Sequence, residues 1–169
     1  MLMYTIRYAN EEDANILGYI HANSWKEAYK NIIPDAVLDN ITVEKREKYF
    51  VKALSDKREE DVLIYKDNKP CGFICIGKCR DEDKDSTDGE IWGIYLLSEY
   101  WKQGIGTEIM TWGLEELKNR GYKKATLWVL EENYSARKFY EKMDFYYDDT
   151  KKELNLGKLL NEVRYIRDL

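Results

Sequence analysis

The sequence predicts a mixed α/β (α+β) fold, in which one central sheet carries helices on its faces. Short apolar segments with strand character alternate along the chain with segments of helical periodicity. The chain has neither internal repeats nor a low-complexity linker. Its 169 residues suit one domain with a sizeable core, so we expect a single domain over residues 1–169.

Strands are expected where β-branched and aromatic residues gather or where polarity alternates. The segments 62–65 and 72–77 flank the turn Asp67–Pro70, which predicts a hairpin. The expected strands are 3–8, 62–65, 72–77, 90–97, 125–130, 145–147 and 162–167.

Helices are expected where apolar residues recur every three or four positions. In the clearest case Ile105, Ile109 and Leu117 share one face, and Gly121 supplies a C-terminal stop. Asn10 and Thr42 are good N-caps for two earlier helices. The expected helices cover 10–29, 42–54, 104–120 and the residues after Asn133, with a short turn or helix at Pro34.

The charge and hydropathy of the chain argue against a protein that binds nucleic acid and against one that spans a membrane. The net charge is −5 and no basic tract stands out, which disfavours nucleic acid as a partner. No apolar stretch approaches the ~18 residues that span a bilayer. The start of the chain has no basic and apolar leader, so we expect a cytoplasmic protein that has no membrane partner.

The three cysteines predict neither disulfides nor a metal site. Cys71, Cys75 and Cys79 are an odd set in a chain without an export signal, and residues four apart on a strand share one face. The only histidine, His21, is remote in sequence. We therefore expect buried strand cysteines, no metal, and a solvated loop at the acidic stretch 81–88.

A pair of glycines opens the helix that follows the strand at 90–97. The turn reads Trp101-Lys102-Gln103-Gly104-Ile105-Gly106-Thr107. Unpaired N–H groups and the helix dipole suit a phosphate there, and glycines allow its close approach. A P-loop is excluded because no Lys-Ser/Thr follows Gly106, and Ile109 occupies the third position of a dinucleotide fingerprint.

A second pattern follows some thirty residues later. Asn133, Ala136, Phe139, Tyr140 and Phe145 follow the order Asn-x-x-Ala-x-x-Phe-Tyr, then Phe. Together with the glycine turn and the order of the elements, this pattern resembles the GNAT superfamily of N-acetyltransferases. The resemblance covers essentially the whole chain. It implies a mixed, mostly antiparallel central sheet flanked by helices and the co-substrate acetyl-CoA.

The resemblance also implies roles for individual residues. The backbone of Ile94, Tyr95 and Leu96 is similar to the strand edge that binds the pantetheine arm. The turn Lys102, Gln103, Gly104, Ile105, Gly106 and Thr107 is similar to the pyrophosphate site. Asn133 matches an asparagine that contacts CoA, although a plain helix cap is the alternative. Tyr140 matches the tyrosine that protonates the leaving thiolate, with a core aromatic as the alternative.

Three positions depart from the family pattern. Trp101 stands where Arg or Gln is usual and removes one polar group from the turn. Asp144 replaces a usual glycine, and aspartate tolerates the left-handed backbone better than most residues. Trp128 occupies the place where some protein-modifying members keep a glutamate base.

Acetyl transfer by direct attack needs a neutral amine, so a base or a water relay must remove a proton. Glu90 is the candidate, with an exposed strand glutamate as the alternative. The Leu96 N–H is the group that the resemblance places at the developing oxyanion.

The run 24–34 resembles a bacterial branch of GNATs that includes polyamine acetyltransferases. Trp25, Glu27 and Tyr29 are therefore candidate contacts for a cationic amine, with core packing of Trp25 and a solvated Glu27 as the alternative. We expect the acceptor to be a primary amine of a small molecule. A protein or peptide acceptor, a CoA-binding regulator without turnover, and a homodimer stay open.

Overall fold

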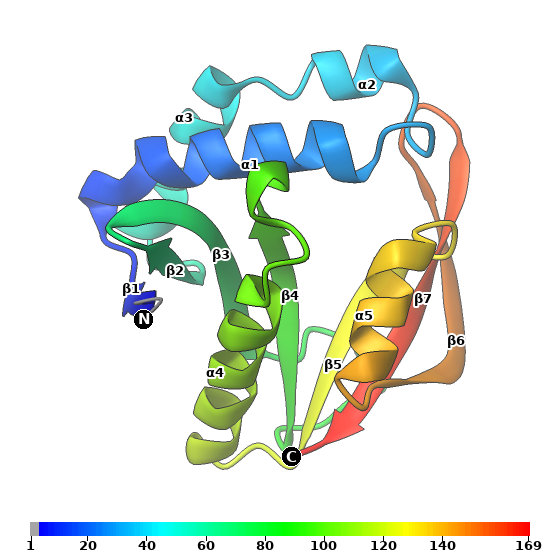
Figure 1. Cartoon of the computed structure of the whole chain (residues 1–169). Helices are drawn as coiled ribbons and strands as arrows, with labels where there is room; N and C mark the ends of the chain where they lie inside the picture. The colour runs from blue at the N-terminus through cyan, green and yellow to red at the C-terminus, as the bar shows by residue number, and fades with distance from the viewer. Residues whose placement is uncertain (1–3) are drawn as a thin grey trace.

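A seven-stranded sheet forms the centre of the computed structural model, which describes residues 4–169 (Figure 1). The strand order is β1-β2-β3-β4-β5-β7-β6, and every neighbouring pair is antiparallel except β4 and β5. The predicted mixed, mostly antiparallel sheet is confirmed. The strands are β1 Tyr4–Tyr8, β2 Glu60–Lys66, β3 Lys69–Lys78, β4 Asp88–Leu96, β5 Lys124–Leu130, β6 Tyr146–Asn155 and β7 Leu159–Asp168. Met3, which the sequence placed in the first strand, lies outside the described residues.

Helices cover both faces of the sheet. The helices α1 and α3 pack on one face, against Leu63 and Phe73, whereas α4 and α5 pack on the other, against Ile64 and Ile74. Successive strand residues point to opposite faces, which is why neighbours in β2 and β3 serve different layers. The helices are α1 Ala14–Ala28, α2 Asp35–Asp39, α3 Val43–Ser55, α4 Ile105–Asn119 and α5 Tyr134–Lys142, with 3-10 turns at Glu11–Asp13 and Ser98–Tyr100.

Helix α4 has the apolar stripe that its sequence predicts. Ile105, Ile109 and Leu117 are fully buried and belong to the largest core cluster. Gly113 lies on the same face, where an added β-carbon would come within 2.8 Å of the Ile74 side chain. The small residue lets the helix approach the sheet closely, which fixes where its N-terminus meets β4.

The C-terminal hairpin is much longer than the sequence suggested. The strands β6 and β7 turn at Gly157, whose φ of 79° favours glycine. Most of β6 is exposed or half-buried, so it lacks the apolar signal that marks a buried strand. The expected segments 145–147 and 162–167 captured only parts of this hairpin.

The acidic loop 81–88 is not merely solvated. The buried Arg164 of β7 pairs with Asp81 and Asp83 of this loop at 3.0 and 2.7 Å, and with Asp148 of β6 at 2.7 Å. The Trp128 indole also donates to Asp81 at 3.1 Å. The loop is therefore tied to β5, β6 and β7, because a buried guanidinium requires acidic partners.

Two smaller expectations concern side chains and membranes. Cys71 and Cys75 are buried in β3, as predicted, whereas the prediction of a buried strand cysteine is wrong for Cys79, which follows the end of β3 and is half-buried; all three have free thiols. Asp144 has a φ of 63°, which confirms its left-handed backbone. Among residues 4–169, no helix is both long and apolar enough to cross a bilayer.

Candidate active site

The sheet opens between its two parallel strands. Pairing of β4 with β5 covers only residues 88–90 and 124–126, after which the strands diverge (Figure 1). The edge of β4 from Ile91 to Leu96 that faces β5 therefore has no strand partner in the described chain. Because backbone N–H and C=O groups require hydrogen bonds, this edge can bind an extended ligand that carries amide groups. It contains Ile94, Tyr95 and Leu96.

The glycine turn lies at the N-terminus of α4, beside this opening. Gly104 caps the helix with a φ of 82°, and Lys102 is also left-handed, with a φ of 59°. The Glu108 N–H donates to the Gly104 carbonyl at 3.1 Å, so the N–H groups of residues 105–107 have no partner within the helix. Free amides at the positive end of the helix dipole suit a diphosphate.

Two side chains of the turn, Gln103 and Trp101, bind neighbouring segments. The Gln103 amide donates to the Glu99 carbonyl at 2.7 Å, and its oxygen accepts from Lys66 at 2.6 Å. The Trp101 indole donates to the Leu96 carbonyl at 3.0 Å. Trp101, which replaces the usual Arg or Gln, thus links the turn to the end of β4. Ile105 is fully buried and offers only its backbone.

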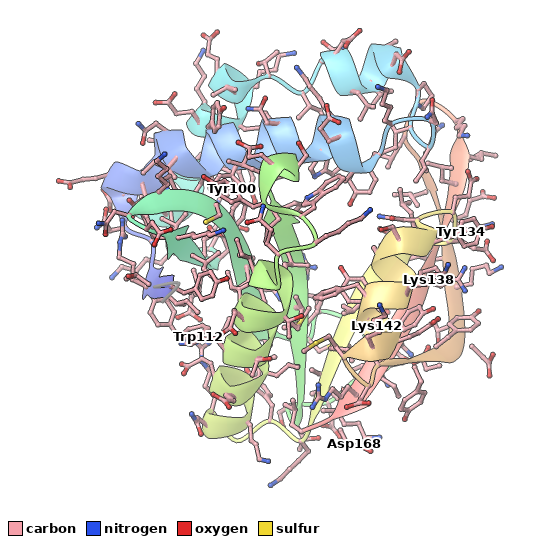
Figure 2. All side chains as sticks on the ribbon, in the orientation of Figure 1. Tyr100, Trp112, Tyr134, Lys138, Lys142 and Asp168 are labelled. Atoms are coloured by element: carbon pink, nitrogen blue, oxygen red, sulfur yellow. The ribbon has the colours of Figure 1, made fainter. Side chains whose placement is uncertain are left out.

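Helix α5 flanks the opening on the β5 side (Figure 1). Asn133 caps it through a hydrogen bond from the Ala136 N–H at 3.2 Å, so the structural role of this asparagine is present. Tyr134, Lys138 and Lys142 follow one another along the helix at one-turn spacing, and all three are exposed (Figure 2). The two lysines place positive charge on the outer surface beside the opening.

Tyr140 projects from α5 into the core. It is 9% exposed, and its hydroxyl makes no hydrogen bond with any of residues 4–169. Burial raises its pKa, and nearby Tyr95 raises it further. Burial likewise raises the pKa of Tyr95 and of Tyr29, the latter also under the influence of Tyr140. Three protonated phenols from α1, β4 and α5 therefore come together near the opening.

Glu90 is buried, so the alternative prediction of an exposed strand glutamate is wrong. It is 1% exposed, and Arg80 binds both of its oxygens: Nη2 to Oε1 at 2.7 Å and Nε to Oε2 at 3.2 Å. The Arg80 backbone N–H donates to Oε2 at 2.9 Å. Glu90 lies at the last residue of β4 that pairs with β5, where the strands begin to diverge.

Of the three residues at the end of α1 that are candidate contacts for the acceptor amine, only two lie close together. The Trp25 and Tyr29 rings contact each other, with centroids 4.7 Å apart. Glu27 lies two residues from each, which in a helix turns it away from both, and it is exposed. The structure therefore brings Trp25 and Tyr29 together with Tyr95 and Tyr140, and it leaves Glu27 apart.

Sequence reasoning missed Gly93. An added β-carbon there would lie 2.6 Å from the Tyr95 ring, so the tyrosine folds over a position that must lack a side chain. The same ring contacts His21, with centroids 4.8 Å apart. A cavity of about 160 Å³ opens beside these residues on the α1 and α3 face. A glycine two residues before a tyrosine in a strand was the only available signal.

The fold and the open edge of β4 define a class of enzyme: a transferase that takes an acyl group from a coenzyme A thioester. The profile of the Acetyltransferase (GNAT) family matches residues 22–145. The chain is 33% identical over 133 residues to the uncharacterized N-acetyltransferase YuaI of Bacillus subtilis, covering 78% of this chain and 74% of that protein. It belongs to the GNAT family and is an acetyl-CoA-dependent N-acetyltransferase.

Another N-acetyltransferase is similar in sequence, and two solved structures are similar in fold. An uncharacterized N-acetyltransferase of Archaeoglobus fulgidus is 28% identical over 142 residues, covering 82% of this chain and 90% of the relative. The fold is similar to that of the PaiA N-acetyltransferase of Thermoplasma acidophilum, solved with coenzyme A, with a TM-score of 0.77, 21% identity and 99% of each chain covered. A ribosomal-protein-alanine N-acetyltransferase of Brucella melitensis has a TM-score of 0.74 at 17% identity, covering 98% of this chain and 99% of that one.

Proposed function

We propose that the enzyme acetylates a primary amine of a small, cationic molecule such as a polyamine. The observation that carries this proposal is the half-open cavity of about 160 Å³ beside Gly93 and Tyr95, on the sheet face opposite α4. A cavity of this size suits an alkyl chain with an amine better than a folded protein surface. Trp25 and Tyr29 lie outside the lining of the cavity, where Trp25 stacks on the lining residue His21, and they supply aromatic faces that can attract a cation.

In the proposed reaction the neutral amine attacks the thioester carbonyl carbon. The N–C bond forms, the carbonyl oxygen takes up the electron pair, and the Leu96 N–H stabilises this oxyanion. Collapse re-forms the carbonyl and breaks the C–S bond, and the thiolate takes the Tyr140 hydroxyl proton. The nitrogen loses its extra proton, and water returns a proton to the tyrosinate. Support for Tyr140 comes from its hydroxyl, which is free of other hydrogen bonds in the described chain and, like any phenol, carries its proton at neutral pH.

Glu90 is proposed to remove the amine proton through a water molecule. Oε2 already accepts from the Arg80 backbone N–H and from Nε, whereas Oε1 accepts only from Nη2 and keeps a lone pair that can accept from water. Acetyl-CoA is proposed to bind through Ile94, Tyr95 and Leu96, through the turn from Lys102 to Thr107, and through Asn133.

The test is release of the CoA thiol from acetyl-CoA in the presence of polyamines, amino acids, aminoglycosides and peptides. Turnover with small amines supports the proposal. Turnover with peptides alone would indicate a protein or peptide acetyltransferase instead. Calorimetric binding of acetyl-CoA without turnover on any acceptor would indicate a regulator.

A further inference from the structure

The floor of the cavity is acidic and belongs to strands that the reaction itself does not use. The cavity lies between the sheet and the helices α1 and α3. Asp61 of β2 faces Cys75 of β3, which in turn faces Gly93 of β4. Glu59 precedes β2, and one ligand atom each of Glu59, Asp61 and Cys75 lie within 4.8 Å of one another.

Several buried polar groups at this floor have no partner. Asp61 is 2% exposed, yet neither of its carboxylate oxygens accepts a hydrogen bond within the described residues. The Glu59 Oε1 atom is also buried and unpartnered, whereas Oε2 accepts from Tyr49 at 3.3 Å and from the Cys75 thiol at 3.8 Å. His21 lines the cavity, is 6% exposed, and has an unpartnered Nδ1 atom. Unpaired buried polar groups are costly, which points to a missing ligand.

The charges around the floor leave one negative charge uncompensated. Arg80 is paired with Glu90, and His21 is neutral because burial lowers its pKa to about 3. Arg46 lies over the Tyr49 ring at 4.2 Å and forms no ion pair within residues 4–169. Two carboxylates therefore face one free guanidinium. Burial, together with nearby Glu59, raises the pKa of Asp61 to about 7, as expected for a carboxylate without its cation.

We infer that Glu59 and Asp61 form a subsite for a second, non-reacting ammonium group of the acceptor. The inference rests on the proposed small-amine function. Asp61 lies two strands from β4, about 10 Å away, so the acceptor carries two cationic groups separated by roughly that distance. One amine reacts at the opening of the sheet, and the other binds the acidic floor.

An ammonium group fits this floor better than a divalent metal. The uncompensated charge is a single one, and an ammonium offers three N–H donors to the unpartnered oxygens of Asp61 and Glu59. Burial raises the pKa of the Cys75 thiol, so without a metal this side chain is neutral and adds no third negative charge to the floor. Cys75 then contributes a small side chain that leaves room above the two carboxylates.

The experiment compares linear α,ω-diamines with monoamines of the same chain length as acceptors in CoA thiol release. We expect KM for the best diamine to be at least about tenfold lower than for its monoamine, as a buried charge-assisted contact implies. Asp61→Asn and Glu59→Gln should each remove most of this difference. Glu60→Gln is the matched control, because Glu60 is an exposed acid of the same strand that pairs with Arg120 at 2.6 Å. It should keep the full diamine preference.

Equal KM values for diamine and monoamine, or an undiminished preference in both Asp61→Asn and Glu59→Gln, would overturn the subsite. So would stoichiometric Zn²⁺ binding that Asp61→Asn and Cys75→Ser abolish. Calorimetric titration with the diamine, without acetyl-CoA, separates the two proposals. If the wild-type protein binds the diamine but acetylates no small amine, and Asp61→Asn abolishes the binding, then the subsite stands and the proposed class of acceptor is rejected. Glu59→Gln serves if Asp61→Asn fails to fold.

Discussion

The Arg80 guanidinium holds the Glu90 carboxylate at the point where β4 and β5 separate, with Nη2 2.7 Å from Oε1. The carboxylate is almost completely buried, while the Arg80 side chain is half exposed. This ion pair therefore fixes the direction of the Glu90 oxygens and keeps one side of the pair open to water.

Glu90→Gln should lower turnover while acetyl-CoA affinity stays nearly unchanged. The amide keeps the shape of the side chain but is a far weaker base, and removal of a general base typically costs ~10²–10⁴-fold in rate. The loss should be greatest at low pH, where most of the amine is protonated. The measurement is kcat/KM against pH, with Glu131→Gln as a control from an exposed ion pair. Unchanged profiles would leave Glu90 with a structural role only.

Tyr140→Phe should reduce turnover by ~10²–10⁴-fold where acetyl transfer limits the rate. Because the hydroxyl makes no hydrogen bond in the described chain, the free energy of unfolding should change by less than about 0.5 kcal/mol. Tyr165→Phe is the contrasting control: its hydroxyl bonds Arg137 and Glu141, at 3.0 Å each, so stability should fall by roughly 1–2 kcal/mol with turnover retained. Full turnover in a folded Tyr140→Phe protein would assign thiolate protonation to another group.

Gly106→Val should weaken binding of CoA by at least about tenfold, or 1.4 kcal/mol. An added β-carbon at Gly106 would meet only the Phe139 ring at 3.5 Å, an ordinary contact, so the fold should persist. The branched side chain would instead occupy space at the free amides of α4. Thr111→Val, at an exposed position further along the same helix, should bind CoA normally. Calorimetry with CoA measures both affinities. Equal affinities in Gly106→Val and Thr111→Val would show that the diphosphate does not bind at this turn.

Asp61→Asn should stabilise the protein above neutral pH. A carboxylate whose pKa is raised to about 7 in the folded state contributes stability below its ordinary pKa, and that contribution is lost as pH rises through 7. Wild-type stability should therefore fall between about pH 4 and 7, by up to about 4 kcal/mol, and the variant should flatten this fall. Urea unfolding between pH 4 and 8 measures the free energy of unfolding of each protein, with Glu60→Gln as the control. Parallel curves for wild type and Asp61→Asn would contradict the raised pKa.

Arg164→Met should destabilise the protein by about 3–5 kcal/mol, because it leaves Asp148 buried without its partner. Hydrogen exchange should also speed up across the loop 81–88, since Asp81 and Asp83 lose their anchor. Lys151→Met removes an exposed pair with Glu131 and should cost less than about 1 kcal/mol. Similar losses in the two variants would show that the Arg164 cluster carries no special stability.

Local pattern was enough to predict most of the elements around the site. The periodicity of Ile105, Ile109 and Leu117 predicted α4 and its buried face, and the order of strands and helices predicted the sheet. The glycine turn and the run from Asn133 to Tyr140 are local motifs, so their placement at one opening followed from the order of the elements. Polar strands were harder to predict, because β6 has no buried residue and its sequence therefore lacks the apolar pattern of a buried strand.

Long-range pairing decided the rest. Arg164 and Asp81 are far apart in sequence, as are Tyr95 and Tyr140, and no local pattern tells which partner a buried charge or phenol will meet. The sequence by itself determined the family, the helix start that suits a phosphate, and the candidates Tyr140 and Glu90. Only the tertiary structure decided that Arg80 neutralises Glu90, that Glu27 faces away from Trp25, and that Asp61 lies unpartnered beneath a cavity. Strand register and helix packing set these contacts, and both depend on the whole chain folding together.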